Sequence, residues 1–348
     1  MKKPNRRERL RILVLFEVHD PPAPDEEYER RMREEADWRT EGHVVAALKE
    51  RGHEVLLGAI YRNVREAIDL VERIQPDLVW NFVQTFHGSR AFESHIAAVL
   101  ELCRVPYTGC GHRALMLCQD KALSKEILKH HRVAVPSFVV SRRAQPVKRL
   151  SRSIFPVFVK PLAEEGSVGI SRESFAESEE QALARVRFLH ERLKVDAIVE
   201  QYVTGREIYV GVVGNERLTV LPPRELKFSK VPEGEPKFAS FKAKWDEGYR
   251  ERWGIFSAFA EDLPEGTPRQ IPVVAKRVFR TLQMRGFGRI DMRLTGEGRL
   301  VVVEANPNPE IARGEDIAVA AEKAGLAYPD LVERIAALGL ESAGPRVG

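Results

Sequence analysis

The first hundred residues alternate between apolar runs and amphipathic stretches. The apolar runs at 11–18, 53–60 and 76–82 predict strands, and the stretches at 25–52, 64–74 and 92–103 predict helices. Strands that alternate with helices indicate βαβ units and a parallel sheet. No G-x-G-x-x-G opens a helix after the first strand, so this Rossmann-like layer lacks the phosphate-binding turn of a dinucleotide site. We expect it to form a first domain over residues 1–115.

The pattern changes after residue 115. A short helix at 119–131 is followed by two strands that flank the loop 141–153, and then by a helix at 179–193. From 197 the chain is rich in strand-forming residues and glycine turns, and a helix at 271–286 leads into two short apolar runs. We therefore expect a small central subdomain over 116–200 and a C-terminal sheet over 201–348, an α/β (α+β) architecture overall.

The last two apolar runs flank T-G-E-G at 295–298, which predicts a β-hairpin. Pairing Leu294 with Arg299 would place five residues on one face, because side chains alternate along a strand: Arg289, Asp291, Val302, Glu304 and Asn306. A wet sheet face is one interpretation of these charges. The other is a Mg²⁺ site, since carboxylate and amide oxygens are hard ligands that leave room for water and phosphate.

Four weaker signals each have an ordinary alternative. Lys160 ends a buried-looking strand before a loop with Gly166 and Ser167, which suits an anion or a plain turn. Lys121 lies in the first turn of its helix, where the macrodipole disfavours a cation by about 0.3–1 kcal/mol unless an anion is near. Such a lysine is also common on surfaces.

The other two signals lie further along the chain. The junction at 200–207 ends an apolar run with groups that suit a base and a ribose, or form a plain sheet edge: Glu200, Gln201, Val203 and Glu207. The lysine-rich stretch 227–252, which includes Lys244, suits either a mobile flap over phosphates or an exposed loop.

Composition narrows the class of protein. The 348 residues carry 55 Lys+Arg against 51 Asp+Glu, and a net charge of +4 gives no argument for nucleic acid. No run reaches membrane-spanning length, and the basic start is not followed by the apolar segment of a signal peptide. Three cysteines without a C-x-x-C pair suit free thiols in a reducing cytoplasm. We expect a cytoplasmic protein with small-molecule partners, and the sequence leaves a homodimer open.

The order of the motifs is more informative about the family than any single motif. The series D-K-x-x-x-K, V-K-P with its Gly-Ser loop, V-E-Q-Y-V-x-G-x-E, K-A-K-W, and G-R-I-D with E-A-N-P-x-P resembles the ATP-grasp superfamily over about residues 10 to 325. More narrowly, it resembles the D-alanine–D-alanine ligase branch. The resemblance implies a Rossmann-like N-terminal layer, a small central lid and a C-terminal mixed sheet, with ATP gripped between the last two.

The resemblance also implies a reaction and its residues. An acylphosphate would form from ATP and a carboxylate, and an amine would convert it to an amide. Lys121, Lys160 and the Ser167 loop would meet the phosphates, and Lys244 would come from the flap. Glu200, Gln201 and Val203 would border adenine, with Glu207 at the ribose. Asp291, Glu304 and Asn306 would coordinate two Mg²⁺, with Mn²⁺ as an alternative, and Arg289 would steady the transferred phosphoryl group. A small-molecule kinase and a non-catalytic nucleotide-binding regulatory protein are the alternatives.

The amino-acid side of the site departs from that branch. The family's G-G-x-S-x-E after the first strand is replaced by FEVHDPPAPDEE, and its tyrosine after A-K is Trp245. Its serine for the second substrate's carboxylate falls near Glu315, in NPNPEIARGED. With Arg313 as the only nearby cation in the sequence, we expect Glu310, Glu315 and Asp316 to favour an acceptor with an amine there, and D-alanine is in doubt.

Overall fold

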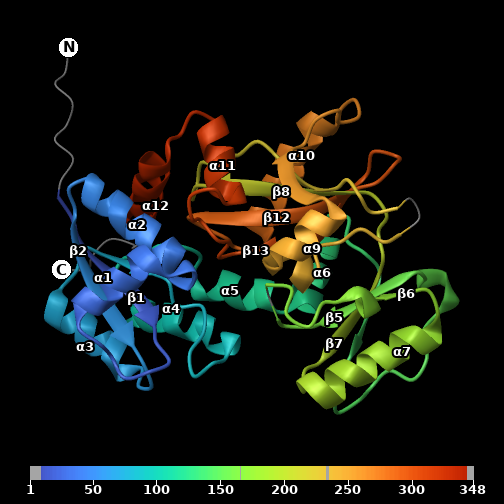
Figure 1. Ribbon diagram of the computed structural model, residues 1–348, viewed down its shortest axis with the longest axis horizontal. Coiled ribbons are helices and arrows are strands. Elements are labelled where there is room, and N and C mark those ends of the chain that lie inside the picture. Colours follow the sequence, from blue (N-terminus) through green and yellow to red (C-terminus); the bar gives the residue numbers. More distant parts are fainter. Residues whose placement is uncertain (1–8, 165, 233–234, 343–348) are drawn as a thin grey trace.

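The computed structural model describes residues 9–164, 166–232 and 235–342 and contains three sheets (Figure 1). The N-terminal sheet is parallel, in the order β2-β1-β3. Its elements are β1 (Arg11–Glu17), α1 (Asp25–Glu34), η1 (Ala36–Trp38), α2 (Arg39–Glu50), β2 (Glu54–Ile60), α3 (Arg65–Ile74), β3 (Leu78–Asn81), η2 (Arg90–Phe92) and α4 (Glu93–Leu102). Successive residues of β1, such as Ile12 and Leu13, point to opposite faces of the sheet and lie in two different hydrophobic cores. The parallel sheet is therefore covered on both faces, as predicted.

Two helices connect this layer to the rest. They are α5 (His112–Gln119) and α6 (Lys121–His130), where the sequence predicted one helix at 119–131. The break lies at Asp120, which has an extended ψ of 99° and accepts hydrogen bonds from the backbone N–H groups of Ala122 and Leu123, both at 2.9 Å. Asp120 is thus the N-cap of α6, and capping side chains of this kind define where a helix begins.

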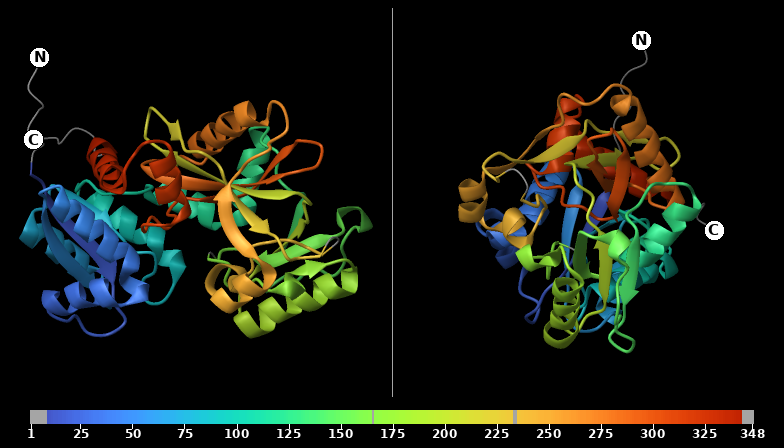
Figure 2. Two further views of the ribbon diagram at one scale, coloured as in Figure 1. Left: turned by 45° about the horizontal axis from the view of Figure 1, so that its top comes forward. Right: turned by 90° about the vertical axis from the view of Figure 1, so that its right-hand side faces the viewer.

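The central sheet is small and antiparallel, in the order β4-β7-β5-β6. Its elements are β4 (Phe138–Ser141), η3 (Arg152–Ile154), β5 (Val157–Pro161), η4 (Arg172–Ser174), β6 (Phe175–Ala176), α7 (Glu179–Phe188), η5 (Leu189–Leu193) and β7 (Ala197–Gln201). Helix α7 covers one face with Ala182 and Val186, which pack on Val157 and Val199. The opposite face turns toward the C-terminal sheet (Figure 2, left).

The C-terminal sheet follows the order β11-β10-β8-β12-β13, with β9 on β8. Its elements are β8 (Arg206–Val213), β9 (Thr219–Val220), β10 (Arg224–Phe228), α8 (Phe241–Trp245), α9 (Glu247–Trp253), β11 (Ile255–Phe259), α10 (Thr267–Thr281), β12 (Phe287–Leu294), β13 (Leu300–Asn306), α11 (Asp316–Lys323) and α12 (Tyr328–Ser342). The described pairings are all antiparallel, where a mixed sheet was expected. The wider α/β class is confirmed.

The β12–β13 hairpin forms with a different register from the predicted one. Leu294 pairs with Leu300, and a bulge between Asp291 and Met292 brings Asp291 opposite Glu304. Val302 pairs with Met292 and is 1% exposed in the core, so its assignment to the polar face was wrong. A bulge adds one residue to one strand, and the spacing of polar residues along the sequence gives no sign of it.

The last helix, α12, packs on the N-terminal layer. Tyr328, Leu331 and Ile335 lie in one core with Ile12 and Trp80. Arg51 donates to Asp330 at 2.7 Å across the same contact. The domain boundaries near 115 and 200 stay a prediction, and the predicted segment 201–348 ends on a helix that belongs by packing to the first sheet.

Among the described residues, no helix is both long and apolar enough to cross a membrane.

Gly42 sets how closely α2 approaches α1. A Cβ atom at this position would lie 2.1 Å from the carbonyl oxygen of Met32, a backbone atom that cannot turn aside. We predict that Gly42→Ala lowers the free energy of unfolding by about 1–3 kcal/mol, because the two helices must move apart. Urea unfolding measures this change.

The control is Gly248→Ala in α9, where the nearest atom to a new Cβ is 3.6 Å away. That substitution should be neutral or should stabilise by up to about 1 kcal/mol through helix propensity. Equal unfolding free energies for the two variants would contradict the close-packing explanation.

Candidate functional site

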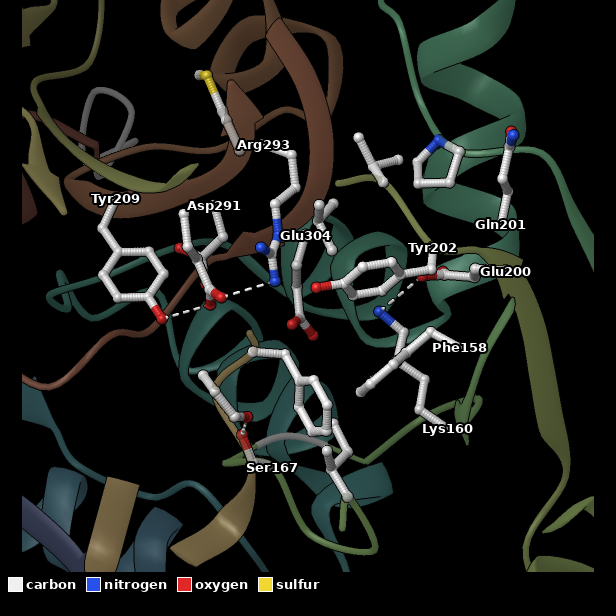
Figure 3. Close-up of a pocket in the computed structure, with 18 of the residues that line it drawn as sticks. Phe158, Lys160, Ser167, Glu200, Gln201, Tyr202, Tyr209, Asp291, Arg293 and Glu304 are labelled. Carbon is white, nitrogen blue, oxygen red and sulfur yellow. Dashed lines mark hydrogen bonds and ion pairs between the residues drawn. The ribbon is translucent and has the colours of Figure 1, made fainter. Parts of the chain in front are cut away.

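A pocket lies between the central and C-terminal sheets (Figure 3). It is lined by most of the residues that the sequence singled out: Lys160, Ser167, Glu200, Gln201, Val203, Glu207, Lys244, Asp291 and Glu304. These come from β5, the loop after β5, β7, the loop after β7, β8, α8, β12 and β13, so segments far apart in the sequence converge on one space. Lys121, Arg289 and Asn306 do not line it. Lys121 is bonded to Glu304 and Arg289 to Asp291, and Asn306 lies two residues beyond Glu304.

Glu200 is the most buried acid of the pocket, with a side chain that is 3% exposed. Its Oε2 lies 3.1 Å from Lys160 Nζ, and its Oε1 lies 2.8 Å from Lys125 Nζ. Burial alone would raise the pKa of Glu200, but the two lysines outweigh it and lower that pKa. The carboxylate is therefore ionised and held between two cations.

The two lysines respond differently to their burial. Burial lowers the pKa of Lys125 to about 8, against the opposing effect of Glu200. Burial also acts to lower the pKa of Lys160, but Glu200 and Glu304 outweigh it and the pKa is raised. Lys160 is thus fully charged at neutral pH, and its ammonium group faces the pocket (Figure 3). A fixed buried cation of this kind suits a phosphate group.

Asp291 and Glu304 oppose each other directly on β12 and β13. Arg289 donates to both oxygens of Asp291, at 2.7 and 2.9 Å, and Lys121 Nζ lies 3.0 Å from Glu304 Oε1. Burial raises the pKa of Asp291 in spite of Arg289. Burial would do the same to Glu304, but Lys121 and the neighbouring lysines bring its pKa well below the ordinary value.

This face matches Mg²⁺ in chemistry. Two carboxylates on adjacent strands and the Asn306 amide two residues beyond Glu304 supply oxygen ligands, with the rest of an octahedron left for water and phosphate. The described residues contain no cluster of three or more His, Cys, Asp or Glu that could hold a metal by itself. A metal here would need the amide and ligand oxygens as well as the two acids.

The junction after β7 has the features of a base-binding edge. Tyr202 N–H donates to Pro156 O at 2.8 Å, whereas the backbone N–H of Val203 has no partner among the described residues. Phe158 and Phe238 make an edge-to-face pair at 4.7 Å beside it. An apolar slot with a free backbone donor suits a flat heterocycle.

Glu207 lies at the end of this slot with its carboxylate fixed. Tyr209 O–H donates to Glu207 Oε1 at 2.7 Å, and Arg293 donates to Oε2 at 2.8 Å. Arg293 also donates to the carbonyl of Lys237, in the flap. The acid is therefore oriented before any ligand arrives, as suits a bond to vicinal hydroxyls.

The glycine loop of the central sheet contacts the lysine-rich segment directly. Ser167 Oγ donates to Ala239 O at 2.9 Å, and Trp245 Nε1 donates to Gly166 O at 3.1 Å. The backbone N–H of Phe241 donates to Ile170 O at 3.2 Å. The flap and the loop thus meet over the pocket, and Lys244 of α8 points into it.

A second cavity of about 1100 Å³ lies further along the same polar face of the hairpin, next to Arg289 and Asn306. Lys244 and Tyr209 line both cavities, and Arg289 and Asn306 line only the second. Its remaining wall comes largely from the N-terminal layer, including Glu17, Arg31, Trp38, Thr85 and Arg90. Sequence analysis missed these residues, because only the fold brings them to the hairpin.

The acids of the loop after Asn306 have protein partners that the sequence did not reveal. Arg39 lies 2.7 Å from Glu315 and 3.4 Å from Glu310, and Arg224 lies 3.2 Å from Asp316. Arg313, by contrast, packs over the ring of Tyr328. Naming Arg313 as the only nearby cation was therefore wrong, and these carboxylates do not by themselves require an acceptor with an amine.

Known proteins share the sequence pattern and the fold. The family model described as D-ala D-ala ligase C-terminus matches residues 127–337. The "Uncharacterized protein y4sG" of Sinorhizobium fredii is 30% identical over 308 residues, 84% of each chain. The D-alanine–D-alanine ligase of Pelotomaculum thermopropionicum is 27% identical over 288 residues, 80% of this chain and 86% of its own.

A solved structure agrees in fold. The crystal structure of D-alanine–D-alanine ligase from Bacillus anthracis complexed with ATP superposes with a TM-score of 0.71 and 19% identity, over 96% of this chain and 98% of that one. The resemblance drawn from the motifs is confirmed, and the chain belongs to the D-alanine–D-alanine ligase family of ATP-dependent carbon–nitrogen ligases, with the ATP-grasp fold.

Proposed function

We propose that this protein is an ATP- and Mg²⁺-dependent carboxylate–amine ligase that forms an amide through an acylphosphate. The observation that carries the proposal is the position of the hairpin's polar face along both cavities. Asp291 and Glu304 line the aromatic pocket, while Arg289, bonded to Asp291, lines the larger cavity. A nucleotide in one cavity and a carboxylate in the other would meet at these residues.

In the proposed site, each end of the nucleotide has its own residues. Gln201, Val203 and the buried Glu200 border adenine, and Glu207 accepts from the ribose hydroxyls. Lys160, Lys121 and the Ser167 loop hold the phosphates, and Lys244 closes on them from the flap. Asp291, Glu304 and Asn306 would hold two Mg²⁺, or Mn²⁺, whose charge would neutralise the phosphate oxygens during transfer.

The reaction has two displacements. A carboxylate oxygen of the first substrate attacks the γ-phosphorus, and the bond to the β-phosphate oxygen breaks, so that ADP leaves. The amine nitrogen of the second substrate then attacks the acyl carbon, inorganic phosphate leaves, and the nitrogen loses a proton. Arg289 and Lys244 face the transferred group and stabilise its charge, which is most of what phosphoryl transfer requires from a protein.

We propose substrates other than two D-alanines. Glu315 stands near the place where the family uses a serine for the second substrate's carboxylate, and here it is paired with Arg39 beside Glu310. A second carboxylate brought there would be repelled by both acids. The 1100 Å³ cavity also offers more space than a pair of alanines would fill.

The function is tested by assaying ADP release over a matrix of carboxylates and amines. We expect ADP and inorganic phosphate in equal amounts, and only when a carboxylate and an amine are both present. Mass spectrometry should detect the amide. ADP with a phosphorylated small molecule and no free phosphate would instead make the protein a kinase, and no turnover with any pair would favour a nucleotide-binding regulatory role.

Glu304→Gln tests the proposed metal site. The substitution keeps the shape of the side chain and removes one ligand charge, so we expect ADP formation to fall by about 100-fold or more. The matched control is Glu297→Gln at the exposed tip of the same hairpin, which should leave turnover unchanged. Wild-type turnover in Glu304→Gln, with both variants folded, would rule out Glu304 as a metal ligand.

Limited trypsin digestion tests the flap. If residues 227–252 close over nucleotide, ATP with Mg²⁺ should slow cleavage at Lys242 and Lys244 several-fold, because lids lose mobility when they sequester a ligand. Cleavage in the exposed loop at Arg143 and Lys148 of the central subdomain provides the reference rate. If both sites were protected equally, or neither, the flap would have no specific part in nucleotide binding.

A further inference from the structure

Helix α6 carries two buried lysines one turn apart. Lys121 and Lys125 are spaced i and i+4, which places them on one face of the helix. Their side chains are 3% and 2% exposed. Lys125 belongs to the D-K-x-x-x-K motif, but neither the nucleotide contacts nor the metal ligands proposed above include it.

Each lysine contacts both the central subdomain and the C-terminal sheet. Lys121 pairs with Glu304 of β13 and donates to the carbonyl of Glu164, which follows β5. Lys125 pairs with Glu200 of β7 at 2.8 Å and donates to the carbonyl of Val303 in β13 at 2.7 Å. The two bridges cross: Lys121 pairs with a carboxylate of the C-terminal sheet and a carbonyl of the central subdomain, and Lys125 pairs with a carboxylate of the central sheet and a carbonyl of the C-terminal sheet.

Backbone contacts strengthen the same connection. The N–H of Lys121 donates to Leu162 O at 3.3 Å, and the N–H of Val302 donates to Ala134 O, just after α6, at 2.8 Å. The backbone of α6 is therefore tied to the residue after β5, the segment after α6 is tied to β13, and Lys125 connects the helix to β7 and β13.

We propose that Lys125 is a positioning residue that, with Lys121, fixes the separation of the central and C-terminal sheets and thereby the shape of the nucleotide pocket. The inference rests on the proposed function for its link to ATP, but the connection between the sheets can be measured without any ligand. Lys125 lies behind the pocket wall and acts through Glu200 and β13.

The effect of Lys125 reaches Lys160 through Glu200. The Glu200 carboxylate has one oxygen at each lysine, so its plane is fixed by both. Without Lys125, a single cation would remain, and the carboxylate would be free to rotate toward Lys160 and draw its ammonium group away from the pocket. Removing Lys125 also takes away the cation at Glu200 Oε1, a buried carboxylate oxygen, which loosens the surrounding packing.

Hydrogen exchange in the nucleotide-free protein tests the connection, with Lys125→Met as the variant. We expect backbone amides at 198–201 and 303–305 to exchange at least about tenfold faster, because local opening becomes easier where the sheets are no longer tied together. Amides at 12–15 in β1 should keep their rate. The matched control is Lys129→Met, one turn further along α6 and exposed, which should change neither set.

Nucleotide binding tests the consequence. At a temperature where both variants are folded, we expect Lys125→Met to raise the Kd for ATP with Mg²⁺ by about tenfold or more, and Lys129→Met to leave it unchanged. In Lys125→Met, kcat measured at saturating ATP should fall less than kcat/KM for ATP, because Lys125 touches no reacting atom.

The outcomes separate the two proposals. If wild-type protein binds no ATP while the exchange pattern appears, the proposed function fails and the connection between the sheets stands. If exchange rises equally in β1, or if Lys125→Met exchanges and binds ATP like Lys129→Met, Lys125 is only a core residue and the inference is wrong.

A second variant covers the case in which Lys125→Met does not fold. In Lys125→Met with Glu200→Gln, the new amide oxygen can still accept a hydrogen bond from Lys160, and Glu304 still attracts that lysine, so folding should be retained. Compared with Glu200→Gln alone, the double variant should exchange faster at 303–305, because the bond from Lys125 to Val303 is still lost. Equal exchange in the two would overturn the proposal.

Discussion

The structure depends on two carboxylates, Glu200 fully buried and Glu304 partly buried, that are neutralised by lysines. An ionised acid in a protein interior is tolerated only when cations and hydrogen bonds replace its lost hydration. Glu200 has Lys125 and Lys160, and Glu304 has Lys121, so three lysines serve two acids. The excess of one positive charge lies beside the pocket. An anionic ligand would balance it, which links the stability of this region to the binding of phosphate.

The same polar face borders two cavities with different chemistry. The proposed nucleotide side keeps the family's motifs in order, and its walls combine aromatic and basic side chains with four carboxylates. The proposed substrate side is built largely from the N-terminal layer and from the segment after Asn306, where this chain departs from the family. Loops change without disturbing a sheet, whereas the ligands of a shared nucleotide are tied to strand register. This difference explains why the two halves of the site can diverge separately.

The sequence predicted what depends on neighbours along the chain and missed what depends on the fold. The parallel layer, the hairpin and its polar residues followed from local patterns. The bulge at Asp291 did not, because it shifts the register without altering composition. Arg39 could not be assigned to Glu315, since 276 residues separate the two. Lys125 had a signal, its i, i+4 spacing from Lys121, but the spacing gave its helix face and not the sheets it would contact.

The bulge has a physical consequence for the metal-binding proposal. In the predicted register Asp291 would have faced Val302, but the bulge brings it opposite Glu304. Like charges directly opposed on neighbouring strands destabilise a sheet. The chain offsets this repulsion with Arg289 on one acid and Lys121 on the other, two cations that come from different elements. A divalent ion placed between the acids would do the same from within the site. The hairpin therefore holds two acids close together, and either protein cations or a bound metal can relieve the repulsion between them. Lys121 also donates to the carbonyl of Glu164, so a metal that replaced Lys121 at Glu304 would also affect the position of the central sheet.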